Sequence, residues 1–335
     1  MPRFKFTILL LGILISYIAP LHAQKIAGVN FVAEKSPIDL KGFDHLHQIN
    51  STWVSWIPYA YCDVKTGNIY HKTKWQWEGE SVSGTERAIQ LAKEQGLKIM
   101  IKPHIWLSDH SFGGRLEMPE NNWYNWEEDY AHYILTFAQL AEKYKVELFC
   151  IGTEQEASTQ KNPDFWKNLI SGIRGVYSGQ ITYAANWDEY TSVPFWNELD
   201  FIGIDAYFPI SSKSNPSIQE LEYEWLKWKD EMFNLHTKYQ VPILFTEYGY
   251  RTTKYATKEP WQSVTEEAYC EPCQSNALQA KFNTFWKENW FAGGFIWKWF
   301  EPNKSILHEN KKSFFIKGKL AEKTVSENYK LFQID

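Results

Sequence analysis

Two glutamates stand at the ends of short, largely apolar runs, and their placement points to acid–base chemistry. Glu247 closely follows the run Pro242–Phe245, and Glu154 closely follows the run Glu147–Gly152. Neither run alternates apolar and polar residues, a pattern typical of strands buried on both faces of a parallel sheet. Paired carboxyl groups at the ends of two such strands are the minimum equipment for cleaving a glycosidic bond.

Strand-like and helix-like patterns alternate along the chain from residue 26 onward, which predicts βα units around a parallel sheet. We expect strands over residues 26–31, 52–58, 98–104, 147–152, 181–185, 201–205, 241–246 and 294–299. We expect helices over residues 38–49, 84–95, 127–145, 163–176, 218–239 and 274–289, with a last helix after residue 319. Repeated units of this kind indicate the α/β class and a single (β/α)8 TIM barrel. An open doubly wound sheet is the alternative, but no glycine-rich phosphate turn follows the first expected strand.

The N-terminus has the pattern of a secretory signal peptide. Arg3 and Lys5 precede an uncharged apolar run over residues 6–18, and Ala23 offers a cleavage point. The run is short for a full membrane span, although an uncleaved anchor is the alternative interpretation. We therefore expect residues 1–23 to be removed and residues 24–335 to form one catalytic domain. The mature protein is expected to be secreted or periplasmic, without membrane association.

The composition disfavours one class of partner and favours another. The chain of 335 residues has a formal net charge of −5 and no basic stripe, so nothing indicates nucleic-acid binding. It holds 17 Trp, 19 Tyr and 21 Phe, most of which must pack in the core. The surplus suits carbohydrate, because the flat apolar faces of sugars stack on aromatic rings. We expect the protein to be a monomer.

The four cysteines are not expected to take part in the chemistry. Cys270 and Cys273 form a C-x-x-C pair, for which export favours a local disulfide. A zinc site would need two further ligands at matching spacing, and none are present. Cys150 lies in an apolar run and is expected to be a buried thiol, while Cys62 is expected to remain free.

The expected strand ends also supply candidates for substrate binding, because active sites of barrels lie at the C-terminal ends of the strands. Tyr207 is expected to bond Glu247, with a packed scaffold tyrosine as the alternative. Glu156 is the nearest rival to Glu154, although we expect it to begin the following helix and to point elsewhere. Lys102 and His104 could merely line the barrel, and the tryptophans could be core. The substrate-binding candidates are Asn30, Trp56, Lys102, His104, Trp106, Asn186, Trp187, Tyr207, Tyr248, Trp297 and Trp299.

The ordered set of strand-end segments resembles glycoside hydrolase family 113, the β-mannanases, within the large clan of retaining barrel glycosidases. The resemblance covers nearly the whole mature chain and rests on Gly28–Phe31, Lys102–His104, Ile151–Glu154, Asp205–Phe208, Thr246–Tyr250 and Trp297–Trp299. It implies that Glu154 is the acid/base, that Glu247 is the nucleophile, and that the substrate is a β-1,4-linked mannan, glucomannan or galactomannan. Many clan members place Asn immediately before the acid/base, where it bonds the sugar 2-hydroxyl, whereas this chain has Thr153.

Two other functions fit the same residues. The barrel could hydrolyse another β-glycan, such as a β-glucan, or it could be a binding protein that has lost catalysis. Both strand-end acids are present, which disfavours the binding protein. Hydrolysis by two carboxyl groups requires neither a metal nor a cofactor, and we expect none.

Overall fold

The computed structural model describes residues 24–33, 35, 37–262, 265–300 and 311–333. The expected signal peptide, residues 1–23, lies outside the described residues. Within the described part of the chain, no helix is long and apolar enough to cross a membrane.

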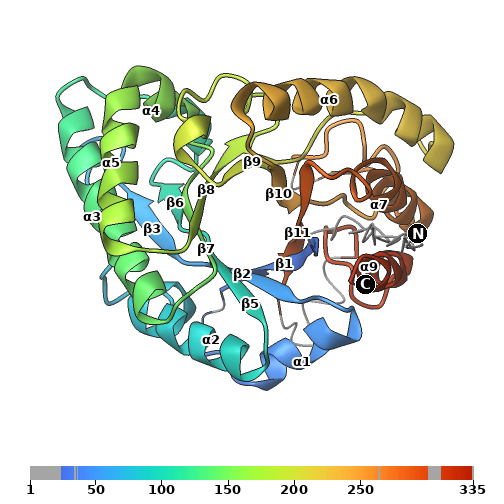
Figure 1. The fold of residues 1–335 in the computed structure, drawn as a ribbon, viewed down its shortest axis with the longest axis horizontal. Helices are drawn as coiled ribbons and strands as arrows, with labels where there is room; N and C mark the ends of the chain where they lie inside the picture. Colours follow the sequence, from blue (N-terminus) through green and yellow to red (C-terminus); the bar gives the residue numbers. More distant parts are fainter. Residues whose placement is uncertain (1–23, 34, 36, 263–264, 301–310, 334–335) are drawn as a thin grey trace, which may run out of the picture.

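Eight parallel strands close into a barrel, as the sequence predicts (Figure 1). Their order around the barrel is β1-β2-β5-β7-β8-β9-β10-β11, so neighbours in sequence are neighbours in space. The barrel strands are β1 (Ile26–Val32), β2 (Trp53–Ile57), β5 (Lys98–Ile101), β7 (Leu148–Thr153), β8 (Gln180–Asn186), β9 (Phe201–Asp205), β10 (Ile243–Tyr248) and β11 (Phe291–Trp299).

Helices surround the barrel and cover its outer face (Figure 1). Their starts follow local sequence signals: Ser217 and Glu220 form a reciprocal capping box at the start of α6. Between β8 and β9 the chain has only the short 3-10 helix η3 (Trp196–Glu198). The α-helices are α1 (Lys41–Gln48), α2 (Val82–Glu94), α3 (Asn122–Lys143), α4 (Glu156–Lys161), α5 (Pro163–Val176), α6 (Ile218–Tyr239), α7 (Glu271–Phe285) and α9 (Leu320–Leu331).

The apolar side chains form two layers, one inside the barrel and one between the barrel and its helices. Successive residues of a strand point to opposite faces, so each strand contributes to both layers. The inner layer is tightly filled: a Cβ atom at Gly28 would lie 2.4 Å from the ring of Phe295, so only glycine fits there. The inner layer comprises Ile26, Trp53, Met100, Leu148, Cys150, Ala184, Phe201, Leu244 and Phe295.

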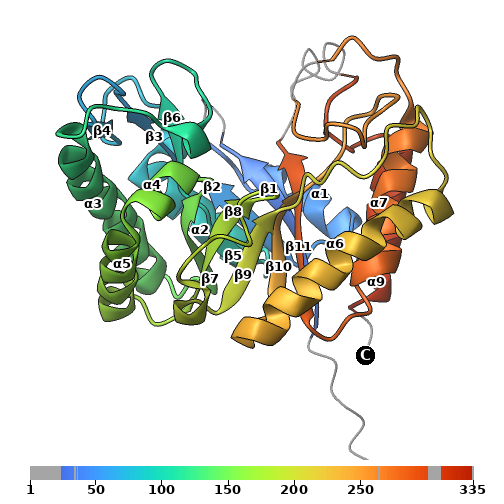
Figure 2. The ribbon, with the colours of Figure 1, turned by 90° about the horizontal axis from the view of Figure 1, so that it is seen from above.

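A small sheet beside the barrel mouth was not expected from the sequence. It joins β3 (Tyr59–Cys62), β4 (Ile69–Tyr70) and β6 (His104–Leu107). The single strand expected over residues 98–104 is wrong, because β5 ends at Ile101 and Pro103 separates it from β6. Proline has no N–H to donate to a ladder, and Pro58 separates β2 from β3 in the same way. In Figure 2 this sheet stands above one side of the barrel and the segment between β10 and α7 above the other.

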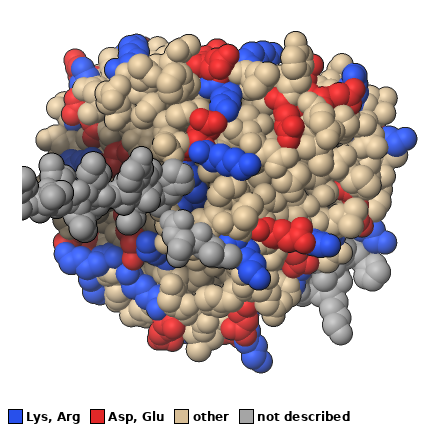
Figure 3. All heavy atoms as spheres, turned by 45° about the vertical axis from the view of Figure 1, so that its right-hand side comes forward, with Lys and Arg blue, Asp and Glu red and all other residues tan. Residues whose placement is uncertain are grey.

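The cysteines behave largely as expected. Cys270 and Cys273 form a disulfide at the start of α7. Cys62 and Cys150 are free and buried. On the face shown in Figure 3, basic and acidic side chains are interspersed over a largely uncharged surface.

Candidate active site

A cavity of about 630 Å³ opens among the C-terminal ends of the barrel strands, and both predicted acids line it. Six of the residues predicted from the sequence meet here: Glu154, Glu247, Asn186, Trp187, Tyr207 and Trp297. The remaining lining residues are Phe112, Arg115, Glu156, Asp188, Trp261 and Phe314. They lie on connections between the strands and helices, whose course the strand pattern does not predict.

Glu247 faces the cavity because β10 carries one extra residue near its end. Between Phe245 and Glu247 the strand advances two positions, while its partner β9 advances only from Ile204 to Asp205. Such a bulge breaks the alternation of faces and re-aims a side chain. As a result, the neighbouring residues Thr246 and Glu247 both reach the polar groups at the barrel mouth.

Two donors hold the carboxylate of Glu247. The Lys102 ammonium donates to Oε1, and the Tyr207 hydroxyl donates to Oε2 at 2.7 Å, the bond expected from the sequence. His104 Nε2 lies 3.7 Å from Oε1. Burial and then the charge of Lys102 hold the pKa of His104 well below its usual value, so the imidazole is neutral near pH 7. A carboxylate held by two donors in this way is fixed in place and ready to act as a nucleophile.

Asp205, which was not among the residues predicted from the sequence, shares Lys102 with Glu247. The ammonium of Lys102 lies 3.2 Å from each carboxyl oxygen of Asp205, and the Thr246 hydroxyl donates to Oδ1 at 2.7 Å. Burial, followed by the charge of Glu247, raises the pKa of Asp205 to about 7. Burial alone would lower the pKa of Lys102, but the two carboxylates outweigh it and raise that pKa. The sequence signals for Asp205 were its position at the end of an expected strand and its place in Asp205–Phe208, one of the segments that carry the family resemblance.

Glu154 projects into the cavity from a strained backbone position. Its φ angle is 51°, in the left-handed region that residues with a side chain rarely adopt, and its N–H donates to the carbonyl of Ala184 at 2.8 Å. Strained positions of this kind gather at functional sites. Burial raises the pKa of Glu154 well above its usual value, and the charges of Asp205 and Glu247 add to the effect. The carboxyl group therefore holds its proton at a pH where ordinary carboxylic acids have lost theirs.

Glu156 lines the same cavity, which corrects the expectation that it points elsewhere. As expected, it begins α4. Burial and then the charge of Asp188 raise the pKa of Glu156, while Arg115 acts in the opposite direction. The first turn of α4 simply directs this side chain toward the cavity, so Glu156 remains a rival to be tested.

Aromatic rings form two sides of the cavity. Trp187 stacks on Trp261, with ring centroids 5.2 Å apart and planes inclined by 13°. On another side, Trp297 lies parallel to the imidazole of His104, with centroids 6.3 Å apart, and Phe314 meets Tyr207 edge-on at 6.0 Å. Flat rings beside acids are suited to a sugar, whose apolar face stacks while its hydroxyls bond to polar groups.

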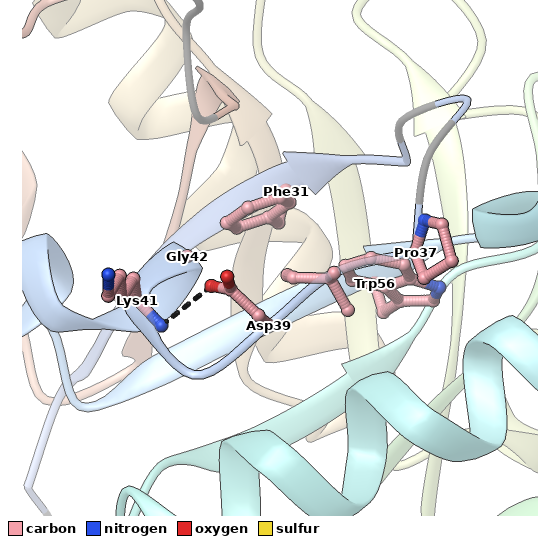
Figure 4. Close-up of a pocket in the computed structure, with 7 residues that line it drawn as sticks. Phe31, Pro37, Asp39, Lys41, Gly42 and Trp56 are labelled. Atoms are coloured by element: carbon pink, nitrogen blue, oxygen red, sulfur yellow. Dashed lines mark hydrogen bonds between the residues drawn. The ribbon is translucent and has the colours of Figure 1, made fainter.

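Two predicted binding residues from the first two strands lie outside this cavity. Trp56 is buried, donates from its indole N–H to the carbonyl of Gly79, and stacks on Phe31. Both rings border a separate pocket of about 250 Å³ at the start of α1 (Figure 4). Asn30 is buried, and its amide donates to the carbonyls of Thr246 and Phe295 at 3.0 and 3.2 Å. It holds the backbone next to Glu247 and does not reach the cavity.

Three further predictions of cavity-lining residues are corrected by the structure. Tyr248 faces the helices and bonds the hydroxyl of Tyr329, because it follows the bulge of β10. Trp299 is fully buried and packs against Phe315. It does not share a face with Trp297, because β11 advances three residues where β1 advances two. Trp106 lies on β6 of the small sheet, exposed and outside the cavity.

A parallel eight-stranded barrel with carboxyl groups from two strand ends and several aromatic rings in the cavity at its mouth is the arrangement of a glycoside hydrolase. The sequence identifies the family. The model of Glycoside Hydrolase Family 113 matches residues 35–319, and the chain belongs to this family, as its strand-end segments predict.

Solved structures agree on the fold. The GH113 β-mannanase AaManA from Alicyclobacillus acidocaldarius, in complex with ManMIm, is 21% identical and superposes with a TM-score of 0.78 over 92% of this chain and 98% of that one. A GH113 β-1,4-mannanase gives 0.79 at 21% identity, covering 92% and 99%. The β-glucuronidase of Faecalibacterium prausnitzii gives 0.64 at 16% identity over 92% of this chain and 49% of that one. No curated protein sequence matches the chain.

Proposed function

We propose that this family 113 glycoside hydrolase cleaves β-1,4-mannosidic bonds with retention, using Glu247 as nucleophile and Glu154 as acid/base. A Glu247 oxygen attacks the anomeric carbon while the glycosidic C–O bond breaks, and the proton of Glu154 passes to the departing oxygen. Glu154, now a carboxylate, then takes a proton from water. That water attacks the anomeric carbon and releases Glu247.

The observation that carries the proposal is the contrast between the surroundings of the two acids. Glu247 receives hydrogen bonds from Lys102 and Tyr207, which suits an ionised nucleophile. Glu154 makes no side-chain hydrogen bond within the described residues, and its pKa is raised by burial and by Asp205 and Glu247, which suits a proton donor. Two carboxyl groups in one cavity with opposite surroundings can divide the acid and nucleophile roles.

The choice of mannan rests on the family and on the aromatic cavity. Two similar solved structures are named β-mannanases, one of them in complex with ManMIm. The departure at Thr153 affects the group next to the acid/base and not the acid itself. The 2-hydroxyl of mannose is axial, so we expect a changed bonding partner to be tolerated at this place.

We also propose that the protein is exported. The apolar run over residues 6–18 after Arg3 and Lys5 supports export, and so does the Cys270–Cys273 disulfide, since disulfides persist mainly in oxidising compartments. Mass spectrometry of the native protein checks this proposal. We expect the mature chain to begin at Gln24, and an intact N-terminus on cytoplasmic protein would contradict export.

Substrate class is tested by incubating the purified protein with mannan, glucomannan and a mannose-free β-glucan, then measuring new reducing ends. We expect release from the first two only, and activity on the β-glucan alone would overturn the mannan assignment. Proton NMR of the first product formed from manno-oligosaccharides should show the β-anomer. An α-anomer at that stage would rule out retention.

The two roles are tested with variants of the cavity acids. Glu247→Ala should abolish turnover, because no covalent intermediate can form. Glu154→Ala should lose about 10²–10⁴-fold on mannan, the usual contribution of a general acid. On an aryl mannoside with a good leaving group, Glu154→Ala should accumulate the glycosyl-enzyme, and azide, which needs no base, should restore turnover as β-mannosyl azide.

Glu156→Ala is the matched control, because Glu156 lines the same cavity as Glu154. We expect this variant to need no azide and to release the aryl group without a burst. Azide rescue of Glu156→Ala and not of Glu154→Ala would exchange the two assignments.

A further inference from the structure

The small sheet beside the barrel has one aliphatic face and one aromatic face. In β3, Ala60 and Cys62 are buried, and they alternate with Tyr59, which is also buried, and with Tyr61, which is partly exposed. The parallel partner β6 continues the pattern: Tyr59 pairs with His104, and Tyr61 pairs with Trp106. Paired residues of neighbouring strands share a face, so these four rings lie on one side of the sheet.

The aromatic face extends away from the barrel into solvent. Tyr70 of β4 pairs with Tyr61 and is 45% exposed. Trp75 meets the ring of Tyr61 edge-on with centroids 4.5 Å apart, and it is 59% exposed. Trp106 stacks on Tyr59 at 5.5 Å and is 50% exposed. Large exposed rings gathered on one sheet face are unusual in a soluble domain and mark a binding surface.

The position of Trp75 is fixed by its neighbour in sequence. The side-chain amide of Gln76 donates to the carbonyl of Tyr59 at 2.6 Å and to that of Glu80 at 3.2 Å. The Tyr61 hydroxyl donates to Glu80 at 2.8 Å. These bonds tie the loop that carries Trp75 to the edge of the aromatic face.

This aromatic face begins at the proposed nucleophile. The imidazole of His104 lies 3.7 Å from Glu247 and meets the ring of Tyr59 at 5.3 Å. From His104 the rings lead outward over β6, β3 and β4, about 10 Å across two strand spacings. That span is comparable with the length of a disaccharide. The aromatic face is therefore continuous with the catalytic cavity, although it does not line the cavity itself.

We propose that the solvent-facing rings of this aromatic face, Tyr61, Tyr70, Trp75 and Trp106, bind the glycone part of a β-mannan chain, beyond the sugar that is attacked. The inference rests on the proposed function. The sugar attacked by Glu247 remains on the enzyme as the glycone, and the aromatic face starts beside Glu247. The leaving sugar must instead lie toward Glu154, because this acid protonates the departing oxygen. Stacking on flat rings suits a neutral polysaccharide and needs no charged partner.

The test compares substrates of different length. The exposed variants Trp106→Ala and Trp75→Ala should each lower the ratio of kcat/KM for mannohexaose to that for mannotriose about fivefold, the factor for one lost stacking contact. Trp106→Phe keeps a flat ring and should retain most of the ratio. Tyr223→Ala on α6, where the side chain is also exposed, is the matched control and should leave the ratio unchanged.

The direction of the chain is tested with mannohexaose labelled by ¹⁸O at its reducing end. Loss of glycone contacts should move cleavage by Trp106→Ala toward the non-reducing end, giving longer labelled products in the mass spectrum. Cleavage that moves the other way would overturn the glycone assignment. A wild type that cleaves manno-oligosaccharides, with unchanged ratio and pattern in both tryptophan variants, overturns this inference alone. A wild type that cleaves none of them overturns the proposed function as well.

Discussion

Replacing Lys102 by Met should destabilise the protein strongly, and more at pH 8 than at pH 5. Lys102 is fully buried between Asp205 and Glu247. At 3.2 Å and an effective dielectric constant of about 20, one such charge pair has a Coulomb energy of about 5 kcal/mol. Desolvation offsets part of this energy in the intact cluster. Removal of the cation leaves two buried carboxyl groups facing each other, a change that typically costs about 3–5 kcal/mol.

The pH dependence follows from Asp205. Its pKa is raised from 3.8 to about 7 in the folded protein, and loss of the Lys102 charge would raise it further. Between the unfolded and folded pKa values, the folded protein binds the extra proton. Stability is therefore favoured at low pH and falls as the pH rises through the folded pKa. The Lys102→Met variant should accordingly recover part of its lost stability when the pH falls from 8 to 5.

Urea denaturation followed by tryptophan fluorescence measures both effects, and a second substitution isolates their cause. The double variant Lys102→Met/Asp205→Asn removes the cation and one of its anions, so it should be at least about 2 kcal/mol more stable than Lys102→Met at pH 8. Lys281→Met is the control. Lys281 is also fully buried, but it donates to the carbonyl of Ala206 and forms no ion pair with a carboxylate in the described residues. A Lys102→Met variant as stable as wild type at pH 8 would refute the ion cluster.

Three other outcomes are expected. Asp205→Asn removes a charge that raises the pKa of Glu154, so the alkaline limb of the kcat/KM profile should move to lower pH; an unmoved limb would contradict the coupling. Trp297→Ala should weaken oligosaccharide binding by about 1 kcal/mol in calorimetry without loss of the folded circular dichroism spectrum, whereas an unfolded variant would favour a packing role. Glu154→Gly should be about 1 kcal/mol more stable than Glu154→Ala in urea denaturation, because glycine tolerates a φ of 51°. Equal stability would mean that the position is unstrained.

The barrel could be predicted from sequence because its strands are buried on both faces. A continuous apolar run such as Pro242–Phe245 has few other environments in a water-soluble domain, and repetition of such runs between helical patterns leaves few topologies. The small sheet escaped prediction for the opposite reason. Its strands are short, and one of them, β4, spans only Ile69–Tyr70. Aromatic and aliphatic residues alternate in these strands over only a few positions, and so short a pattern also occurs in loops.

The site was harder to predict, because it depends on where individual strands depart from regular alternation. In a regular strand side chains alternate between the two faces, so knowing the face of one residue gives the face of every other residue. On that rule Trp297 and Trp299 would share a face, yet the extra residue in β11 separates them. The strand β7 also has an extra residue, because it advances three positions from Cys150 to Thr153 while β8 advances two. No local sequence pattern marks these bulges, so only the folded ladder shows which strand-end residue reaches the cavity.

The bulge of β10 also explains why Asp205 belongs to the site. In the proposed mechanism Glu247 becomes a neutral ester, which would leave Lys102 as a buried cation without its nearest anion. Asp205 supplies a second anion to the same ammonium. The charge of Glu247 helps to raise the pKa of Asp205. Esterification of Glu247 removes that charge and favours the ionised form of Asp205, so Lys102 keeps an anionic partner while the ester exists. Because the bulge turns both Thr246 and Glu247 toward Asp205, one backbone irregularity positions the nucleophile and stabilises the anion that keeps Lys102 paired throughout the reaction.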